Sequence, residues 1–129
     1  WSSDVCSSDL HLLNAEAFAK MKPGVTIVNT ARGKLIDSDA LLKALESGQV
    51  GAASLDVLEN ENGLYYYDRM GDVIPNTELA ALRAMPNVLL TDHTAFYTYD
   101  AVKSMVLSVL ESASAFAEGL PTRHDVTDR

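Results

Sequence analysis

Three short apolar runs alternate with segments of helical pattern, and this alternation is the strongest constraint on the fold. The runs cover 25–30 (VTIVNT), 52–57 (AASLDV) and 88–91 (VLLT). Each is too short for a typical helix, and the first is rich in β-branched residues, so we interpret them as buried strands. The order strand, helix, strand, helix, strand predicts an α/β fold whose crossovers make the sheet parallel.

Helical patterns fill the segments around these runs. We predict helices over 14–22, from Asp37 or Ser38 to about 47, over 77–85 and over 99–118. Asn14 is a suitable N-cap for the first helix, and the last one carries apolar residues at helical spacing. Small residues at 51–54 predict close helix packing on both faces of the middle strand. The polar and aromatic loop 58–76 has a length typical of functional or disordered loops.

Charge and composition exclude several classes of function. The net charge of −8 argues against binding to nucleic acid or to an anionic membrane, because both use clustered Lys and Arg. No run approaches the roughly 18 apolar residues of a membrane span, and no stretch near residue 1 reads as a secretory signal. We predict no metal site.

The first ten residues, WSSDVCSSDL, differ from the rest of the chain. SSDV and SSDL form an imperfect repeat that resembles translated sequencing-adapter sequence, so we interpret 1–10 as a non-native leader. Without it, 11–129 contain no Cys, which excludes disulfides and thiolate catalysis there. A reducing compartment is compatible with that composition.

Arg32, Glu61 and His93 each follow the end of a different predicted strand. The carboxyl ends of parallel strands meet at one edge of the sheet, where ligands bind in open α/β folds. Arg binds a carboxylate through two parallel hydrogen bonds, and His transfers protons near neutral pH. A carboxylate beside the His would orient its ring and favour the protonated form. The residues alone leave open whether Glu61 or Glu59 is that carboxylate.

Three motifs in this order, NTARG (29–33), LDVLENE (55–61) and DHTAFYT (92–98), resemble the D-isomer-specific 2-hydroxyacid dehydrogenases, and the D-lactate dehydrogenase branch in particular. The likeness covers essentially all of 11–129. It implies a Rossmann-type NAD-binding domain inserted into a flavodoxin-like substrate domain. It places 11–98 in the second half of a doubly wound parallel sheet, and 99–129 in a helix and tail that return to a missing substrate domain.

The same resemblance implies a role for each matching residue. Arg32 would bind the substrate carboxylate, His93 would be the catalytic acid and base, and Glu61 would be its carboxylate partner. The expected nicotinamide-binding residues are Thr30, Ala31, Arg32 and Asp56. Phe96 and Tyr97 would line the substrate pocket. The sequence departs from the family at Asp92, where proline is usual, so the carboxylate would either act on His93 or point to solvent.

The resemblance implies a fragment of an NAD-dependent oxidoreductase for D-2-hydroxy acids and 2-oxo acids, with D-lactate and pyruvate as substrates. The fragment alone is expected to be inactive, and the intact enzyme to be a cytoplasmic homodimer. The residues of this chain do not distinguish NAD from NADP. Alternatives are a hydroxyisocaproate, glycerate or phosphoglycerate dehydrogenase, a corepressor that retained the fold, and a non-catalytic α/β binding module.

Overall fold

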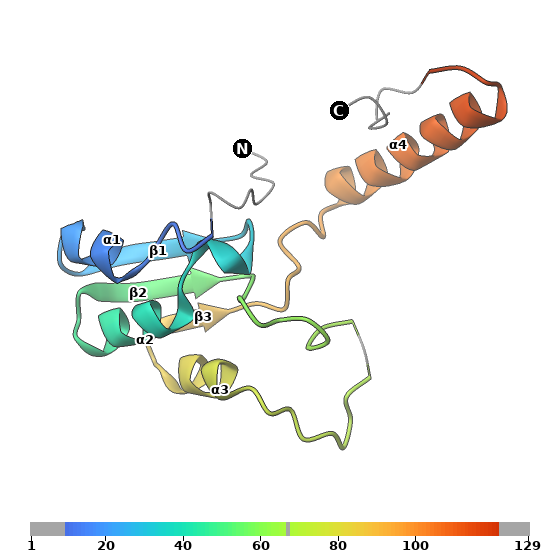
Figure 1. Cartoon of the computed structure of the whole chain (residues 1–129). Helices are drawn as coiled ribbons and strands as arrows, with labels where there is room; N and C mark the ends of the chain where they lie inside the picture. Colours follow the sequence, from blue (N-terminus) through green and yellow to red (C-terminus); the bar gives the residue numbers. More distant parts are fainter. Residues whose placement is uncertain (1–9, 67, 122–129) are drawn as a thin grey trace. The chain divides into compact units, whose positions relative to one another are not determined.

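The computed structural model describes residues 10–66 and 68–121, and the chain divides into two compact units. The first unit, Trp1–Thr94, holds the sheet and the helices packed on it. The second, Ala95–Arg129, holds the long helix α4 (Figure 1). The candidate site belongs to the first unit.

The sheet has three parallel strands in the order in which they occur along the chain. They are β1 (Val25–Asn29), β2 (Val50–Leu55) and β3 (Val88–Leu90). Asn29 is the register partner of Leu55, and Leu55 is that of Leu90, so the three strands end level with one another. The predicted parallel α/β arrangement is therefore confirmed.

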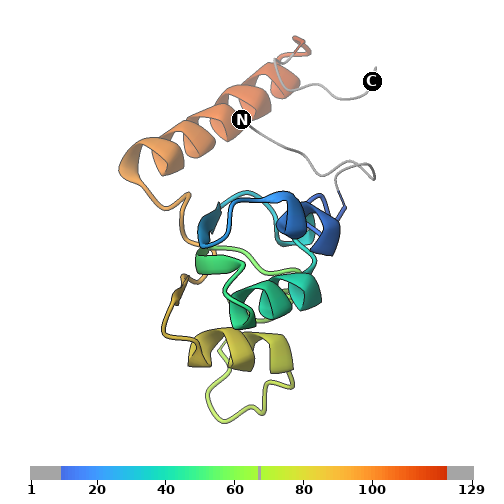
Figure 2. The ribbon, with the colours of Figure 1, turned by 90° about the vertical axis from the view of Figure 1, so that its left-hand side faces the viewer.

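The helices of the first unit follow the predicted segments. They are α1 (Ala15–Lys20), α2 (Ser38–Glu46) and α3 (Thr77–Ala84), and the short 3₁₀ helix η2 (Gly33–Leu35) lies between β1 and α2. Side chains of Asn14, Asp37 and Asn76 cap the three α-helices by accepting a backbone N–H. The N-cap of α2 is thus Asp37 and not Ser38. Helix α2 packs between α1 and α3 (Figure 2).

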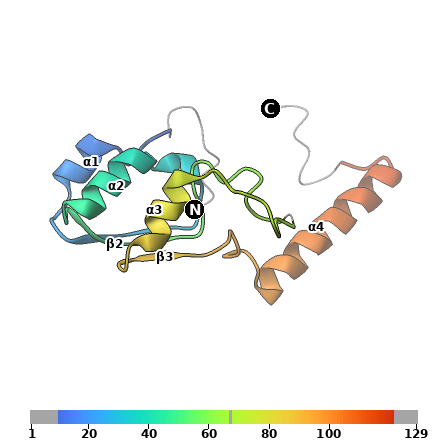
Figure 3. The ribbon, with the colours of Figure 1, turned by 90° about the horizontal axis from the view of Figure 1, so that it is seen from below.

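All three of these helices lie on one face of the sheet (Figure 3). On that face Ile27, Ala53 and Leu55 are buried, whereas Val28 and Leu89 on the other face are 68% and 61% exposed. Within the first unit, the helices therefore cover one face of the sheet only (Figure 3). The reason is topological, because right-handed crossovers between strands that advance in one direction put every crossover helix on the same face.

The core lies between the sheet and this helical layer. Phe18, Leu41 and Leu82, one from each helix, are at most 2% exposed. The buried apolar cluster comprises Phe18, Ile27, Ile36, Ala40, Leu41, Ala44, Leu45, Val50, Ala53, Leu55, Leu58, Leu79 and Leu82. Burial of this apolar area supplies the main stabilisation of the first unit.

Helix α4 (Tyr99–Ala117) has the predicted length, and Thr98 caps its first turn. None of its residues is buried, and its large exposed apolar side chains range from Leu107, 46% exposed, to Phe116, 85% exposed, whereas Val102 is half-buried. No helix in the described residues is both long and apolar enough to cross a membrane. The predicted apolar residues are therefore present on this helix.

Gly33 brings two of the strand-following loops into direct contact. It is buried, and a Cβ placed on it would lie 2.0 Å from both the carbonyl carbon and the carbonyl oxygen of Leu58. No flexible side chain is involved in this approach, so only a shift of backbone could relieve the clash. Glycine is therefore required where the loop after β1 packs on the loop after β2.

Substitution of Gly33 by alanine is expected to lower the free energy of unfolding by about 1–3 kcal/mol, because overpacking forces the two backbones apart. Urea denaturation followed by circular dichroism measures the change. Lys34→Ala, at the exposed neighbouring position, is the control and should change stability by less than about 0.5 kcal/mol. A Gly33→Ala chain as stable as the unmodified chain would contradict the packing described here.

Candidate active site

The turn after β1 is shaped by a buried amide. Asn29 is 6% exposed, its Nδ2 donates to the carbonyl of Arg32 over 2.9 Å, and its Oδ1 accepts from the N–H of Ala31 over 3.0 Å. The side chain of Arg32 is exposed, and its Nη1 donates to the carbonyl of Ala31 over 2.8 Å. Among the described residues no carboxylate forms an ion pair with Arg32, so its guanidinium can bind an anion.

The turn after β3 is held by a carboxylate from the end of β2. Asp56 is 4% exposed, and its Oδ1 accepts from the hydroxyl of Thr91 over 2.5 Å and from the N–H of Thr94 over 2.9 Å. These two contacts lie on either side of His93. Asp56 thus positions the His93 turn, and its expected contact with nicotinamide stays a prediction.

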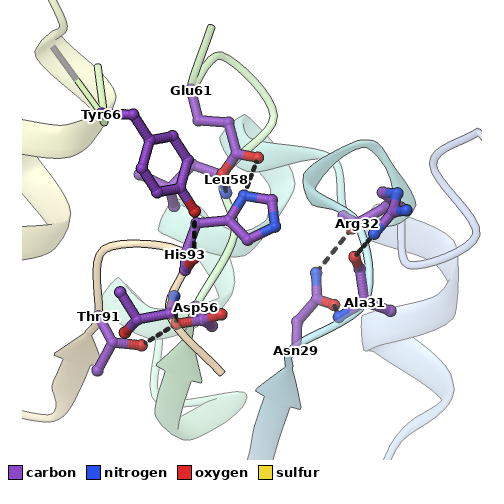
Figure 4. A network of polar contacts seen from close by, with 10 residues as sticks. Asn29, Ala31, Arg32, Asp56, Leu58, Glu61, Tyr66, Thr91 and His93 are labelled. Atoms are coloured by element: carbon purple, nitrogen blue, oxygen red, sulfur yellow. Dashed lines mark hydrogen bonds and ion pairs between the residues drawn. The ribbon is translucent and has the colours of Figure 1, made fainter. Parts of the chain in front are cut away.

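His93 and Glu61 contact each other at the centre of this edge. Nδ1 of His93 lies 2.9 Å from Oε1 of Glu61, and the two side chains are 29% and 19% exposed. The other oxygen of Glu61 accepts from the N–H of Leu58 over 2.8 Å. The carbonyl of His93 accepts from the hydroxyl of Tyr66 over 2.5 Å. Figure 4 shows Arg32 at the same edge of the sheet as this pair.

Glu59 has a different partner, although it lies only two residues from Glu61. Its Oε1 is 2.6 Å from Nε2 of His11. Its Oε2 lies 3.3 Å from the hydroxyl of Ser38, which is also 2.6 Å from a carboxylate oxygen of Glu78. The hydrogen bond that His11 donates to Glu59 raises the pKa of His11 above 6.5, desolvation opposes this, and the charges of Glu59 and Asp37 add to the rise.

Asp92, which stands where the family usually has proline, lies at the surface. Its carboxylate is 3.7 Å from Nη2 of Arg83, and the side chains of Asp92 and Arg83 are 66% and 59% exposed. Partial burial raises the pKa of the nearby Tyr65 hydroxyl, and the negative charges of Asp92 and Glu61 raise it further. The Tyr65 hydroxyl therefore stays protonated at neutral pH.

The two aromatic residues expected in the substrate pocket belong to the second unit. Phe96 and Tyr97 form an edge-to-face pair with their ring centroids 6.1 Å apart, and they are 41% and 76% exposed. Their role toward a substrate stays a prediction. Thr30, expected near the nicotinamide, is exposed in the turn after β1.

Sequence reasoning missed the residues that position this site. Asn29, Gly33, Thr94 and Tyr66 hold its loops but carry no catalytic group of their own. Asn29 was detectable, because a polar residue that ends an apolar run and precedes a turn is suited to bond its own backbone. No sequence signal identifies Tyr66, since its partner lies 27 residues away.

Comparison with known proteins identifies the family of the chain. The sequence model described as "D-isomer specific 2-hydroxyacid dehydrogenase, NAD binding domain" matches residues 6–95. The chain belongs to the D-isomer-specific 2-hydroxyacid dehydrogenase family. The resemblance in the three motifs, the Rossmann-type fold class and the NAD cofactor expected of a family member are thereby confirmed.

Several relatives in this dehydrogenase family cover most of the chain. This chain is 44% identical over 112 residues to a D-lactate dehydrogenase of Lactobacillus delbrueckii subsp. bulgaricus. The match covers 87% of this chain and 34% of that protein. The D-lactate dehydrogenase structure TP0037 of Treponema pallidum superposes with a TM-score of 0.90 at 37% identity, covering 95% of this chain and 37% of that one.

A structure of the D-isomer-specific 2-hydroxyacid dehydrogenase of L. delbrueckii ssp. bulgaricus in its NAD-complexed form superposes with a TM-score of 0.89 at 31% identity. That match covers 97% of this chain and 38% of the other. The chain therefore spans about a third of the length of the relatives it matches.

The contact with Glu59 predicts a raised pKa for His11 and a stability that depends on pH. The pKa of His11 in the folded chain exceeds the ordinary value of 6.5. The contact therefore contributes its full stabilisation of the folded state at pH values below 6.5. Its contribution is lost as the pH rises through the raised, folded-state pKa. An NMR titration of the His11 imidazole is expected to give a midpoint above 6.5.

The two glutamates supply a matched pair of variants for this titration. Glu59→Gln is expected to return the His11 midpoint toward 6.5, because the charged acceptor is lost. Glu61→Gln removes the same charge two residues away and should leave the His11 midpoint in place, since Glu61 contacts His93. An equal response to both variants would contradict the pairing.

Proposed function

We propose that the intact enzyme to which this chain belongs interconverts a 2-oxo acid and the corresponding D-2-hydroxy acid with NAD(H). The observation that carries the proposal is the His93–Glu61 pair, 2.9 Å apart, at the sheet edge that also bears Arg32. A cation, a proton donor and a carboxylate at the ends of parallel strands form a suitable set for reducing a carbonyl beside a carboxylate.

Arg32 is the group proposed to bind the substrate. Its planar guanidinium accommodates a carboxylate through two parallel hydrogen bonds, which fixes the acid in one orientation. The buried amide of Asn29 shapes the turn that carries Arg32. This binding would hold C2 of the substrate at a constant place relative to His93.

His93 is the proposed acid and base. Glu61 contacts Nδ1 and so orients the ring, and we assign proton transfer to Nε2. During reduction His93 donates its proton to the carbonyl oxygen at C2, and during oxidation it removes the proton of the hydroxyl group. A nicotinamide cofactor held at this edge would supply the hydride to C2 in reduction and accept it from C2 in oxidation.

The residues at this edge fit a nicotinamide cofactor. Three parallel strands end level there, and dinucleotides bind outside the carboxyl ends of such strands. Thr30, Ala31 and Arg32 follow β1, and Asp56 follows β2, so the four residues proposed to hold the nicotinamide share this edge. The relative solved with NAD shares the fold of this region.

D-lactate and pyruvate are the proposed substrates. The support is the likeness to relatives named D-lactate dehydrogenase and the HTAFYT segment at residues 93–98, which resembles the D-lactate dehydrogenase branch. A homodimeric assembly and a cytoplasmic location belong to the same proposal and rest on the family. Pyruvate should be preferred over a bulky 2-oxo acid such as 2-oxoisocaproate in a substrate panel.

A chimera provides the test of activity. The matched part of this chain replaces the corresponding third of the L. delbrueckii D-lactate dehydrogenase, and pyruvate reduction is followed by NADH absorbance. His93→Gln is expected to lower kcat by about 10²- to 10⁴-fold, because the proton donor is lost. Arg32→Lys should mainly raise KM, by about 10- to 100-fold, because the paired hydrogen bonds are lost.

Two substitutions outside the site are the controls for these variants. His11→Gln removes the other histidine that pairs with a glutamate, and Lys34→Arg exchanges one exposed cation for another. Both should leave kcat and KM unchanged. Near-normal pyruvate reduction by the His93→Gln or the Arg32→Lys chimera would overturn the proposed roles.

The 129-residue chain on its own is proposed to be inactive. It spans about a third of its relatives' length, and the apolar residues of α4 and of one sheet face are exposed. Large exposed apolar surface favours association. Purified chain should therefore show no NADH oxidation with pyruvate and should self-associate in sedimentation experiments. Measurable turnover by monomeric chain would refute this.

A further inference from the structure

Two non-glycine residues with left-handed backbone conformations meet at the candidate site. His93 has φ of 53° and Tyr66 has φ of 67°. Side chains other than glycine rarely adopt this region, and they persist there only where the surrounding contacts impose it. We therefore attribute the left-handed backbone of His93 to the contacts around it.

The flanks of the His93 turn and His93 itself are held by different parts of the chain. Oδ1 of Asp56 accepts from Thr91 on one side and from Thr94 on the other. The carbonyl of His93 accepts from the hydroxyl of Tyr66 over 2.5 Å, and its ring contacts Glu61. The end of β2 thus anchors the turn, and the loop after β2 holds the histidine.

Glu61 and Tyr66 belong to one short stretch of this loop. The N–H of Leu64 donates to the carbonyl of Glu61 over 2.9 Å, which closes a turn between the two residues. One segment therefore contacts both the imidazole and the peptide group of His93. Figure 4 shows the Tyr66 ring on the same side of His93 as Glu61, with its hydroxyl directed at the backbone.

We propose that Tyr66 is a positioning residue for proton transfer, whose hydroxyl holds the His93 peptide in its left-handed conformation. This inference rests on the proposed function, because it concerns the histidine assigned there as acid and base. Without the hydroxyl, the carbonyl loses a donor and the backbone of His93 can relax to a negative φ. The Cα–Cβ bond would then turn, and the ring would leave the orientation that Glu61 supports.

The exposure of Tyr66 separates this role from a contribution to packing. The residue is 69% exposed, and its ring centroid lies 6.3 Å from that of His93 at an interplanar angle of 52°. Tyr66→Phe retains the ring and removes only the hydroxyl. Tyr99→Phe is the matched control, since Tyr99 is 79% exposed and lies at the start of α4.

The first experiment measures kinetics in the chimera described above. Tyr66→Phe is expected to lower kcat about tenfold, equivalent to about 1.4 kcal/mol in the barrier, with KM within about twofold and an unchanged urea midpoint. Tyr99→Phe should leave all three values unchanged. An unchanged kcat, a rise in KM alone, or a loss of kcat that accompanies a lower urea midpoint would each overturn the proposal.

The second experiment does not depend on activity. The φ of His93 is measured in the Tyr66→Phe protein by crystallography or by NMR scalar couplings. A negative φ with the fold retained supports the proposal, and a positive φ overturns it. If the parent chimera does not reduce any 2-oxo acid, the proposed function fails, whereas this measurement still decides whether Tyr66 controls the His93 backbone.

Discussion

The parallel register of the three strands is the constraint on which the site depends. Asn29 lies opposite Leu55, and Leu55 lies opposite Leu90, so β1, β2 and β3 end at one level. Parallel pairing requires a crossover between neighbouring strands, and α2 and α3 supply the two that are needed. Each strand therefore delivers the loop that follows it to the same edge. Residues remote in sequence share a site because their strands share a direction.

Level strand ends alone do not determine the conformation of the loops. Buried polar side chains fix it through their hydrogen bonds to the loop backbone. Asn29 and Asp56 are the two polar residues of the described chain buried beside the apolar core. A buried amide or carboxylate is costly unless its hydrogen bonds are satisfied, so burial itself enforces the contacts that these residues make. Asn29 satisfies both ends of its amide within the turn that leads to Arg32. Asp56 bridges the two sides of the His93 turn.

The sequence predicts this fold well because its elements are local and periodic. The strands and helices appear within one or two residues of the predicted ranges, and the three functional candidates follow the strand ends as expected. Contacts between loops leave no periodic pattern in the sequence. The approach of Gly33 to Leu58 and the bond from Tyr66 to His93 arise only after folding. The small residues of β2 indicate close packing but do not indicate which helices supply it, and the helices of the first unit cover only one face (Figure 3).

The two histidine–glutamate pairs show why residue type alone does not assign function. His93–Glu61 and His11–Glu59 have the same chemistry, at 2.9 Å and 2.6 Å, and their glutamates are two residues apart. The first pair stands on the turn after β3, at the edge that bears Arg32. The second joins the segment before α1 to the loop after β2 and shares Ser38 with Glu78. The position of the histidine relative to the strand ends therefore separates the pair that we propose for proton transfer from the pair that joins two segments of the chain.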